Sequence, residues 1–439
     1  MRLSVIGCGY LGAVHAACMA DLGHEVVGID VDEAKIASLA AGKAPFHEPG
    51  FQDILERSLA SGRLRFSTDI AEVADAQAHF IAVGTPQQQG SDAADLRFVD
   101  AAVEALLPHL KPENEDGPVI VVGKSTVPAG TAERLSEQIA PTGARLVWNP
   151  EFLREGYGVK DTLYPDRIVY GVPEGPDGEI AAAVLDEVYE DQLRRHIPRI
   201  ITDMATAQLV KVAANAFLAT KISFINAMAE ICEVTGADVT QLAVAIGHDE
   251  RIGKLFLKAG VGFGGGCLPK DIRAFAARAE ELGVGQAVGF LREVDAINLR
   301  RRERVVELAV EALDGDVSGK RVAVLGASFK PNSDDLRDSP ALDIARRLHS
   351  LGADVVVTDP EALANVAKAH PELEQAEDAW AAARGAELVV LVTEWREYVV
   401  LDPEDFGEVV ASKRVIDGRN VLSPAKWRAA GWEYRGLGR

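Results

Sequence analysis

The sequence predicts an α/β protein with two doubly wound, Rossmann-like domains joined by a helical central segment that contains a long helix. Three observations support this fold class. A strand, a glycine turn, a helix and a second strand follow one another over residues 2–30, and a similar but longer unit returns over residues 320–360. Between them, residues 203–234 are nearly all helix-forming. Apolar β-branched runs that alternate with helices favour parallel sheets with right-handed crossovers. We expect domains at 1–200, 201–315 and 316–439.

The first unit carries a dinucleotide-binding pattern. Gly7, Gly9 and Gly12 form GxGxxG directly after the strand RLSVI and at the start of an Ala-rich helix, so backbone amides and the helix N-terminus can face a pyrophosphate. Asp30 ends the next apolar strand, where a carboxylate accepts hydrogen bonds from ribose hydroxyls and repels a 2′-phosphate. This context favours NAD over NADP. The alternative is a glycine-tightened turn that binds no ligand.

The central segment is predicted to be helical. Thr202 or Asp203 can cap a helix that continues to Val234 and stops before Gly236. A second helical stretch, rich in arginine and glutamate, runs over about residues 286–313. We expect this segment to bridge the two sheets and to be a candidate contact between two subunits.

The second doubly wound unit lacks the glycine fingerprint. Its strand KRVAVLGASF continues into Phe329 and Lys330 where the first unit has its later glycines. Lys330 and Arg337 lie near a strand's carboxyl end, which suits the diphosphate of another phosphate-bearing ligand. Solvated surface charge is the alternative interpretation.

The segment VGFGGGCLPKD, residues 261–271, is the most informative stretch for chemistry. Its glycines let backbone approach a ligand closely, and Pro269 suits the first turn of a following helix. Cys267 would then lie at a helix N-terminus beside Lys270, a setting that stabilises a thiolate. A lone cysteine is more often an inert core residue, but the glycines, the proline and the lysine together favour a nucleophile.

Polar residues elsewhere could complete a reactive site. Lys211 and Asn215 are four residues apart on the predicted long helix, so they share a face and could donate to a developing oxyanion. Lys211 lies among apolar residues, so it must snorkel, be paired or be functional. Glu151 follows the predicted strand RLVW, at the strand end where sites form in open sheets. The turns VGTP (83–86) and STVPAGT (125–131) could line a nicotinamide crevice or be ordinary turns.

Composition excludes several partners. The formal net charge is −21 and the pI is about 4.9, which argues against nucleic acid or an anionic membrane as a partner. Four cysteines at scattered positions show no metal-ligand spacing, so we expect reduced thiols and no metal. No signal peptide and no uninterrupted apolar run long enough to cross a bilayer is recognised in the sequence. We expect a cytoplasmic protein.

These motifs together resemble the UDP-glucose/GDP-mannose dehydrogenase family, and within it the UDP-glucose 6-dehydrogenases. The resemblance covers essentially the whole chain, through GCGYLG, PFHEPG, VGTP, KSTVP, NPEFLREG, PDRIVYG, LVKVAANAFLATKISFINAMAE, GFGGGCLPKD, SFKPNSDDLRDSP and VIDGRN. It implies two successive NAD-linked oxidations of UDP-glucose to UDP-glucuronate, with UDP-sugar binding in the last domain. It also implies a homodimer.

The resemblance also implies residue roles. Cys267 is the nucleophile that captures the aldehyde and carries the thioester. Glu151 is an acid/base, Lys211 and Asn215 stabilise oxyanions, and Thr126 and Asp271 order a water and proton path. The expected NAD contacts are Gly7, Gly9, Tyr10, Leu11, Gly12, Asp30, Lys35, Thr85, Thr126, Glu155, Lys270 and Arg337. The expected substrate contacts are Glu151, Phe152, Leu153, Lys211, Asn215, Arg251, Phe263, Gly264, Lys330 and Arg419, with Arg251 and Arg419 as candidates for contact from a neighbouring subunit.

Two alternatives stay open. Leu268 follows the cysteine where many relatives have an aromatic residue, and GDP-mannose dehydrogenases share this leucine, so GDP-mannose is the second candidate substrate. PDRIVYG and NAFLATKISFIN resemble the UDP-glucose enzymes better. A non-catalytic protein that senses NAD or a nucleotide is the other alternative, but it would have no use for Cys267 together with Lys211.

Overall fold

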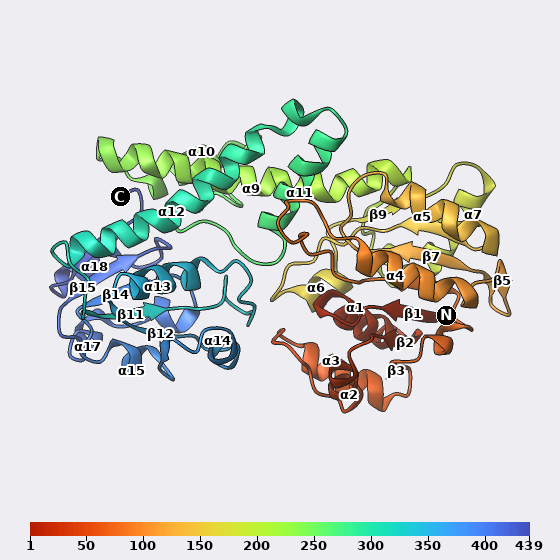
Figure 1. The fold of residues 1–439 in the computed structure, drawn as a ribbon, viewed down its shortest axis with the longest axis horizontal. Coiled ribbons are helices and arrows are strands. Elements are labelled where there is room, and N and C mark those ends of the chain that lie inside the picture. Colours follow the sequence, from red (N-terminus) through yellow and green to blue (C-terminus); the bar gives the residue numbers. More distant parts are fainter. The chain divides into compact units, whose positions relative to one another are not determined.

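The computed structural model describes residues 1–439. It divides into two compact units, which are described one at a time. The first comprises residues 1–214 and 277–283, and the second comprises residues 215–276 and 284–439 (Figure 1). The three-part division expected from the sequence stays a prediction. The α/β fold class with two doubly wound sheets and a helical central segment is confirmed.

The first unit is built on an eight-stranded sheet in the order β10-β9-β8-β7-β4-β1-β2-β3. Every neighbouring pair is parallel except β8 and β9, which meet in an antiparallel contact between Trp148 and Gly171. The strands are β1 (Arg2–Ile6), β2 (Glu25–Ile29), β3 (Leu64–Ser67), β4 (Ala78–Ile81), β7 (Ile120–Gly123), β8 (Arg145–Trp148), β9 (Ile168–Gly171) and β10 (Arg199–Thr202). The chain order reverses on either side of β1, which creates the crevice where open α/β sheets bind ligands.

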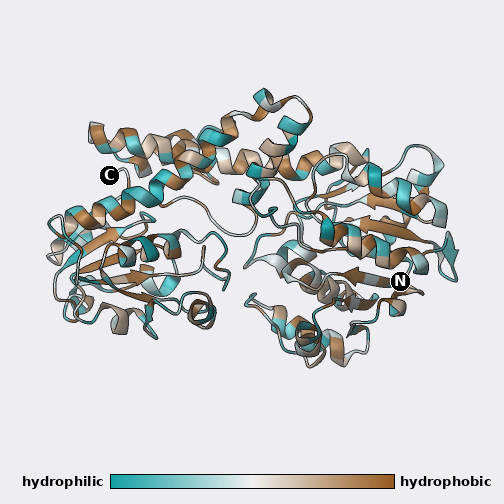
Figure 2. Ribbon diagram, in the orientation of Figure 1, coloured by the Kyte–Doolittle hydropathy of each residue, from teal (hydrophilic) through white to brown (hydrophobic).

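Helices connect these strands. They are α1 (Tyr10–Asp21), α2 (Glu33–Ala40), α3 (Phe51–Ala60), α4 (Arg97–Leu106), α5 (Thr131–Ile139), α6 (Gly158–Leu163), α7 (Pro176–Val188) and α8 (Glu190–Arg194). A two-stranded ribbon of β5 (Glu113–Asn114) and β6 (Gly117–Pro118) lies outside the main sheet. Figure 2 shows hydrophobic colouring concentrated on the strands, in line with the near-continuous apolar runs of parallel sheets.

The predicted long helix is present as α9 (Met204–Thr235). Asp203, one of the two predicted capping residues, caps the N-terminus of α9, because its carboxylate accepts the Thr206 N–H at 2.7 Å. The helix starts in the first unit and continues in the second from Asn215 onward. By length and composition alone, α9 could cross a membrane. The sequence itself contains no uninterrupted apolar run long enough to cross a bilayer. In the second unit, however, Ala216, Ala219 and Ile225 are buried in its hydrophobic cores, as in the core helix of a folded domain.

The second unit contains a six-stranded parallel sheet in the order β13-β12-β11-β14-β15-β16. Its strands are β11 (Arg321–Leu325), β12 (Asp354–Thr358), β13 (Glu374–Gln375), β14 (Leu388–Leu391), β15 (Arg414–Asp417) and β16 (Glu433–Gly436). Its helices are α10 (Val239–Gly247), α12 (Phe290–Ala312), α13 (Pro340–Ser350), α14 (Leu363–Ala369), α15 (Ala379–Ala383), α16 (Arg396–Val399), α17 (Pro403–Phe406) and α18 (Pro424–Ala429). The predicted strand–helix–strand unit over residues 320–360 is therefore confirmed.

The helix α11 (Leu268–Glu281) begins directly after Cys267. Cys267 accepts the Asp271 N–H at its carbonyl oxygen, 3.0 Å away, which closes the first turn of the helix. Pro269 lies in that first turn, where the missing N–H of proline costs no helical hydrogen bond. The predicted position of the cysteine at a helix N-terminus is confirmed.

Candidate active site

The glycine turn of the first unit has the shape of a pyrophosphate site. A Cβ on Gly12 would lie 1.8 Å from the carbonyl oxygen of Gly7, so the close packing of helix against strand requires glycine there. At Gly9, the residue before α1, a Cβ would meet no protein atom within 4 Å. Packing therefore does not explain Gly9. A bare backbone beside the N-terminus of α1, where amides lack intrahelical acceptors, fits a bound phosphate.

Asp30 lies directly after β2, as predicted, and is held firmly. Its Oδ2 accepts the N–H of Cys8 in the glycine turn at 2.8 Å, and its Oδ1 accepts the N–H of Asp32 at 3.0 Å. The ammonium of Lys35 donates to Oδ2 at 2.9 Å. The two residues expected to contact the adenosine ribose are thus each other's partners, and the carboxylate is fixed next to the glycine turn.

Tyr10 and Glu48 form a network that the sequence interpretation did not include. The Tyr10 hydroxyl donates to Oε2 of the buried Glu48, and the same oxygen accepts the N–H of Gly156 at 2.7 Å. Burial raises the pKa of Tyr10 far above its usual range, so its proton stays in this hydrogen bond. The network ties the GCGYLG turn to the loop NPEFLREG. Glu48 lies in the motif PFHEPG, for which the sequence predicted no role.

Glu151 and Lys211 form an ion pair in the first unit. Nζ of Lys211 lies 3.0 Å from Oε1 of Glu151, and Oε2 accepts the Leu153 N–H at 2.6 Å. Both side chains are nearly buried. Nζ of Lys211 also lies 5.7 Å from the centre of the Phe152 ring, and the guanidinium of Arg167 stacks 3.8 Å from that ring. Of the three interpretations of Lys211, a paired lysine is therefore observed.

The two predicted polar turns lie side by side. They follow the adjacent strands β4 and β7, and the Thr85 hydroxyl donates to the carbonyl oxygen of Thr126 at 2.7 Å. Ser125 links the same two turns, since its hydroxyl donates to the carbonyl oxygen of Val83 at 2.7 Å. These turns stand at the carboxyl edge of the sheet, where open α/β sheets bind ligands.

In the second unit, Cys267 is exposed. The other three cysteines of the chain are buried. A Cβ on Gly266 would lie 2.4 Å from the Cζ of Arg337, and one on Gly265 would lie 2.7 Å from the Phe329 ring. The glycine segment therefore packs directly against the SFKPN loop and Arg337. A guanidinium beside the N-terminus of α11 adds positive charge where a thiolate would form.

Asp271 organises the first turn of α11. Its Oδ2 accepts a hydrogen bond from Nδ2 of Asn215 at 2.6 Å, and its Oδ1 accepts one from Nζ of Lys270 at 2.5 Å. Asn215 and Asp271 are both buried. Three predicted site residues, Asn215, Lys270 and Asp271, are thus linked to one another, and Asp271 lies four residues after Cys267.

Two α12 residues that the sequence interpretation missed bind the backbone of Phe263, four residues before Cys267 in the chain. Asn298 accepts the Phe263 N–H at 2.7 Å and donates to its carbonyl oxygen at 2.9 Å. Arg302, one turn later, also donates to that carbonyl at 3.0 Å. Both side chains are buried. In the sequence of this helical stretch, an arginine or asparagine that binds a loop cannot be distinguished from one that faces solvent.

Four cationic residues predicted to contact substrate or NAD in the second unit differ in setting. Arg419 donates to the carbonyl oxygens of Val392 at 2.6 Å and Gly262 at 2.8 Å, so its guanidinium braces the glycine segment. Arg251 is largely exposed and paired with Asp249 at 2.6 Å. Nζ of Lys330 lies 5.2 Å from the Phe329 ring. Arg337 pairs with Asp335 at 2.7 Å.

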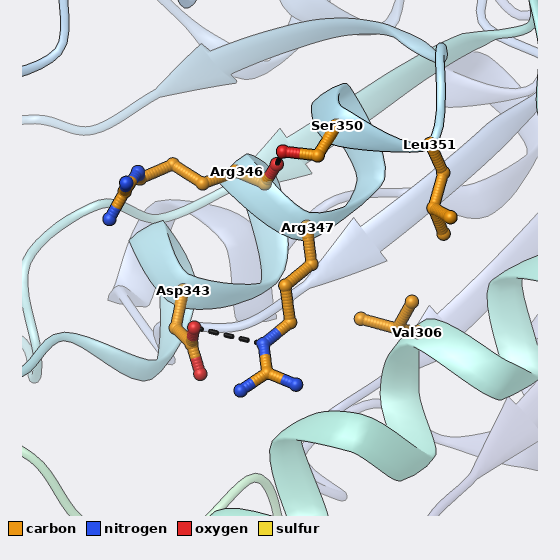
Figure 3. A pocket seen from close by; sticks show the side chains of 6 residues that line it. All are labelled: Val306, Asp343, Arg346, Arg347, Ser350 and Leu351. Carbon is orange, nitrogen blue, oxygen red and sulfur yellow. Dashed lines mark hydrogen bonds and ion pairs between the residues drawn. The ribbon is translucent and has the colours of Figure 1, made fainter.

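A separate hollow lies over α12 and α13 in the second unit. It measures about 450 Å³, and Figure 3 shows Arg347 directed toward Asp343 while Arg346 extends away from both. It is lined by Val306, Asp343, Arg346, Arg347, Ser350 and Leu351. None of the predicted site residues lines it.

Comparison with known proteins identifies the family. Three family models match in order: the NAD binding domain over residues 1–193, the central domain over 205–300 and the UDP binding domain over 323–424 of the UDP-glucose/GDP-mannose dehydrogenase family. The chain belongs to the UDP-glucose/GDP-mannose dehydrogenase family. It is an NAD-dependent oxidoreductase, as the glycine turn and Asp30 predicted.

Members of this dehydrogenase family match the chain along its whole length. UDP-glucose 6-dehydrogenase from Rhizobium meliloti is 40% identical and covers 100% of both chains. The enzyme of the same name from Pseudomonas aeruginosa is 42% identical, over 100% of this chain and 98% of its own. The solved structure of a UDP-glucose dehydrogenase from Pyrobaculum islandicum has a TM-score of 0.89 and 39% identity, over 100% of this chain and 97% of that chain.

Proposed function

We propose that this dehydrogenase oxidises the C6 primary alcohol of UDP-glucose to a carboxylate, and so produces UDP-glucuronate through a thioester on Cys267. The observation that carries the proposal is the position of Cys267, which is exposed at the N-terminus of α11 beside Lys270 and Arg337. A cysteine with that setting has the means to become a thiolate. NAD, when bound, accepts one hydride in each of two oxidations.

Two oxidations and one hydrolysis convert the alcohol to the carboxylate. The alcohol loses a hydride and a proton to give the aldehyde and one NADH. The sulfur of Cys267 adds to the aldehyde carbon, and the oxygen takes a proton to give a thiohemiacetal. Loss of a second hydride and a proton yields the thioester and a second NADH. Water then breaks the C–S bond, which releases the carboxylate and restores the thiol.

We assign roles in this reaction to five polar residues. Lys211 donates to oxygens that become negative, and Asn215 does the same from the next turn of α9. Glu151, whose carboxylate pairs with Lys211, takes a proton from the water that hydrolyses the thioester. Asp271 and Thr126 order the water and proton path. The hydrogen bond between Asn215 and Asp271 supports a fixed orientation for the amide.

We assign UDP-glucose, and not GDP-mannose, as the substrate. The full-length relatives that match at about 40% identity are UDP-glucose 6-dehydrogenases. Leu268 is the one feature that favours GDP-mannose. It begins α11 directly after Cys267, so it lies close to the reacting group in either case.

A homodimer through α9 is the expected assembly. Phe217, Phe224 and Ile231 are exposed at intervals of seven residues, a spacing that places them along one stripe of the helix. Phe217 is 67% exposed, which is unusual for a phenylalanine in a folded domain. The same stripe on a second copy would bury this surface, since two-fold interfaces join identical patches. We place this dimer in the cytoplasm, as the composition suggests.

Incubation of the protein with NAD and either nucleotide sugar tests the proposal. UDP-glucose should yield two NADH per sugar, and GDP-mannose should yield much less. Absence of NADH from both would favour a non-catalytic sensor of NAD or a nucleotide. Faster turnover of GDP-mannose would reverse the substrate assignment.

A further inference from the structure

Lys124 is a buried cation that the proposed reaction does not use. It follows β7 directly, within the first unit, and its side chain is only 7% exposed. Lysine ammonium groups are rarely buried without a paired carboxylate because desolvation of the charge is costly. Its presence at the carboxyl edge of the sheet therefore requires an explanation.

The ammonium of Lys124 is held by a neutral partner. Nζ donates to Oδ1 of Asn149 at 2.9 Å and lies 5.8 Å from the centres of the Phe80 and Tyr189 rings. The Tyr189 hydroxyl donates to the same Oδ1 at 2.6 Å, and Nδ2 of Asn149 donates to the Val169 carbonyl at 2.9 Å. Asn149 is thereby fixed in one orientation, two residues before Glu151.

The charged neighbours of Lys124 are Glu151 and Lys211. Burial lowers the pKa of Lys124 to about 8, while the charge of Glu151 raises it and that of Lys211 lowers it. His15 of α1 also faces it, but burial holds the pKa of that imidazole far below its usual range. Burial raises the pKa of Tyr189 well above its usual range. Between pH 6 and 8, only Glu151 and Lys211 therefore share the charge balance with Lys124.

We propose that Lys124 is a positioning residue that holds Glu151 in place for thioester hydrolysis, through its charge and through its hydrogen bond to Asn149. The inference rests on the proposed role of Glu151. Lys211 must also serve the oxyanions of the two oxidations, whereas Lys124 is buried and donates to Asn149, two residues before Glu151. The charge of Lys124 attracts the Glu151 carboxylate, and the hydrogen bond to Asn149 fixes the backbone that carries Glu151.

Three substitutions separate the charge of Lys124 from its hydrogen bond. Lys124→Met removes both, Lys124→Gln keeps a donor for Asn149 without the charge, and Lys124→Arg keeps both. The exposed Lys111→Met is the matched control. The measurement is the rate of thioester breakdown at Cys267 as a function of pH, followed by intact-protein mass spectrometry after rapid quenching.

We expect the plateau rate of thioester breakdown to fall by about tenfold in Lys124→Met and by less in Lys124→Gln. The rate should stay close to that of the parent protein in Lys124→Arg and in the control. An unchanged plateau rate in both neutral variants would overturn the inference. If Lys124→Met does not fold, the glutamine variant alone decides.

A double-mutant cycle tests the same coupling without activity. Melting temperatures are compared for the parent protein, Lys124→Met, Glu151→Gln and the double variant. We expect the two changes to be non-additive by about 2 °C or more, with Lys124→Met better tolerated once Glu151 is neutral. Additive effects would contradict the inference. If the parent protein forms no thioester, the proposed function fails while this cycle still decides the coupling.

Discussion

Lys211 and Glu151 form an ion pair in which Nζ lies 3.0 Å from Oε1, and the two side chains are only 6% and 12% exposed. Bringing two charges out of water costs free energy that their attraction only partly offsets, so such a pair is weak support for stability. Its position at the carboxyl edge of the sheet instead favours a chemical role. Removal of either partner leaves the other as an uncompensated charge, so variants need a stability control.

Lys211→Ala should lower kcat about a hundredfold or more, because one donor to the developing oxyanion is lost. The Michaelis constant for the nucleotide sugar should change little. Lys221→Ala is the control on the same helix, since Nζ of Lys221 donates to the Ile252 carbonyl at 2.9 Å and has no proposed part in the chemistry. A variant that raises only the Michaelis constant would show that Lys211 binds substrate and does not stabilise the transition state.

Asp30→Ala should weaken NAD binding and narrow the preference for NAD over NADP, because the carboxylate that repels a 2′-phosphate is gone. The ratio of kcat/KM for the two cofactors measures this. Asp32→Ala is a neighbouring control, since the Asp32 carboxylate caps α2 by accepting the Lys35 N–H at 3.0 Å. Equal use of both cofactors by the parent protein would contradict the role of Asp30.

The stability of the first unit should depend on pH through Lys124. Burial lowers the folded-state pKa of this lysine from 10.5 to about 8. Above pH 10.5 the lysine is neutral in both states and no penalty remains. As the pH falls from 10.5 to 8, only the unfolded state gains the proton, so stability is lost across that window and levels off below it.

The melting temperature of the parent protein relative to Lys124→Met should therefore fall between pH 10 and 8. Measurements in matched buffers at several pH values check the direction. A relative melting temperature that stays constant or rises as the pH falls would show that the ammonium is not desolvated.

Phe224→Glu should dissociate the proposed dimer, because a charge would enter the centre of the apolar stripe on α9. Light scattering after size exclusion gives the mass directly. Phe290→Glu, a change at an exposed phenylalanine outside the α9 stripe, should leave the mass unchanged. A parent protein that is monomeric at all concentrations would contradict the dimer.

The sequence was sufficient for features that depend on local patterns. The α9 boundaries followed from the capping residue Asp203 and the glycine at 236, and the start of α11 followed from Pro269 behind Cys267. Asp30 was assigned because strand, turn and helix have nearly fixed lengths in such a unit. Each of these signals lies within one continuous segment of the chain.

Features that depend on long-range contacts were not predictable in this way. Glu48 reaches Gly156 across 108 positions, and Lys124 reaches Asn149 across 25. Asn298 of α12 holds the backbone of Phe263 across 35 positions. A lysine after a buried strand, as at Lys124, is the one pattern that could have suggested a functional group. The pairing of Lys211 with Glu151 likewise needed the sheet to place residue 151 beside α9.

The most direct test of the account is the stoichiometry of NADH formation in Cys267→Ser. An aldehyde has no good hydride to give until a nucleophile adds to it, and a serine hydroxyl lacks the thiolate fraction that the N-terminus of α11 confers on sulfur. The parent protein should form two NADH per UDP-glucose. The serine variant should stall, either before the second NADH or as a covalent sugar ester visible by intact-protein mass spectrometry. Normal steady-state formation of two NADH per UDP-glucose by Cys267→Ser would contradict covalent catalysis at Cys267.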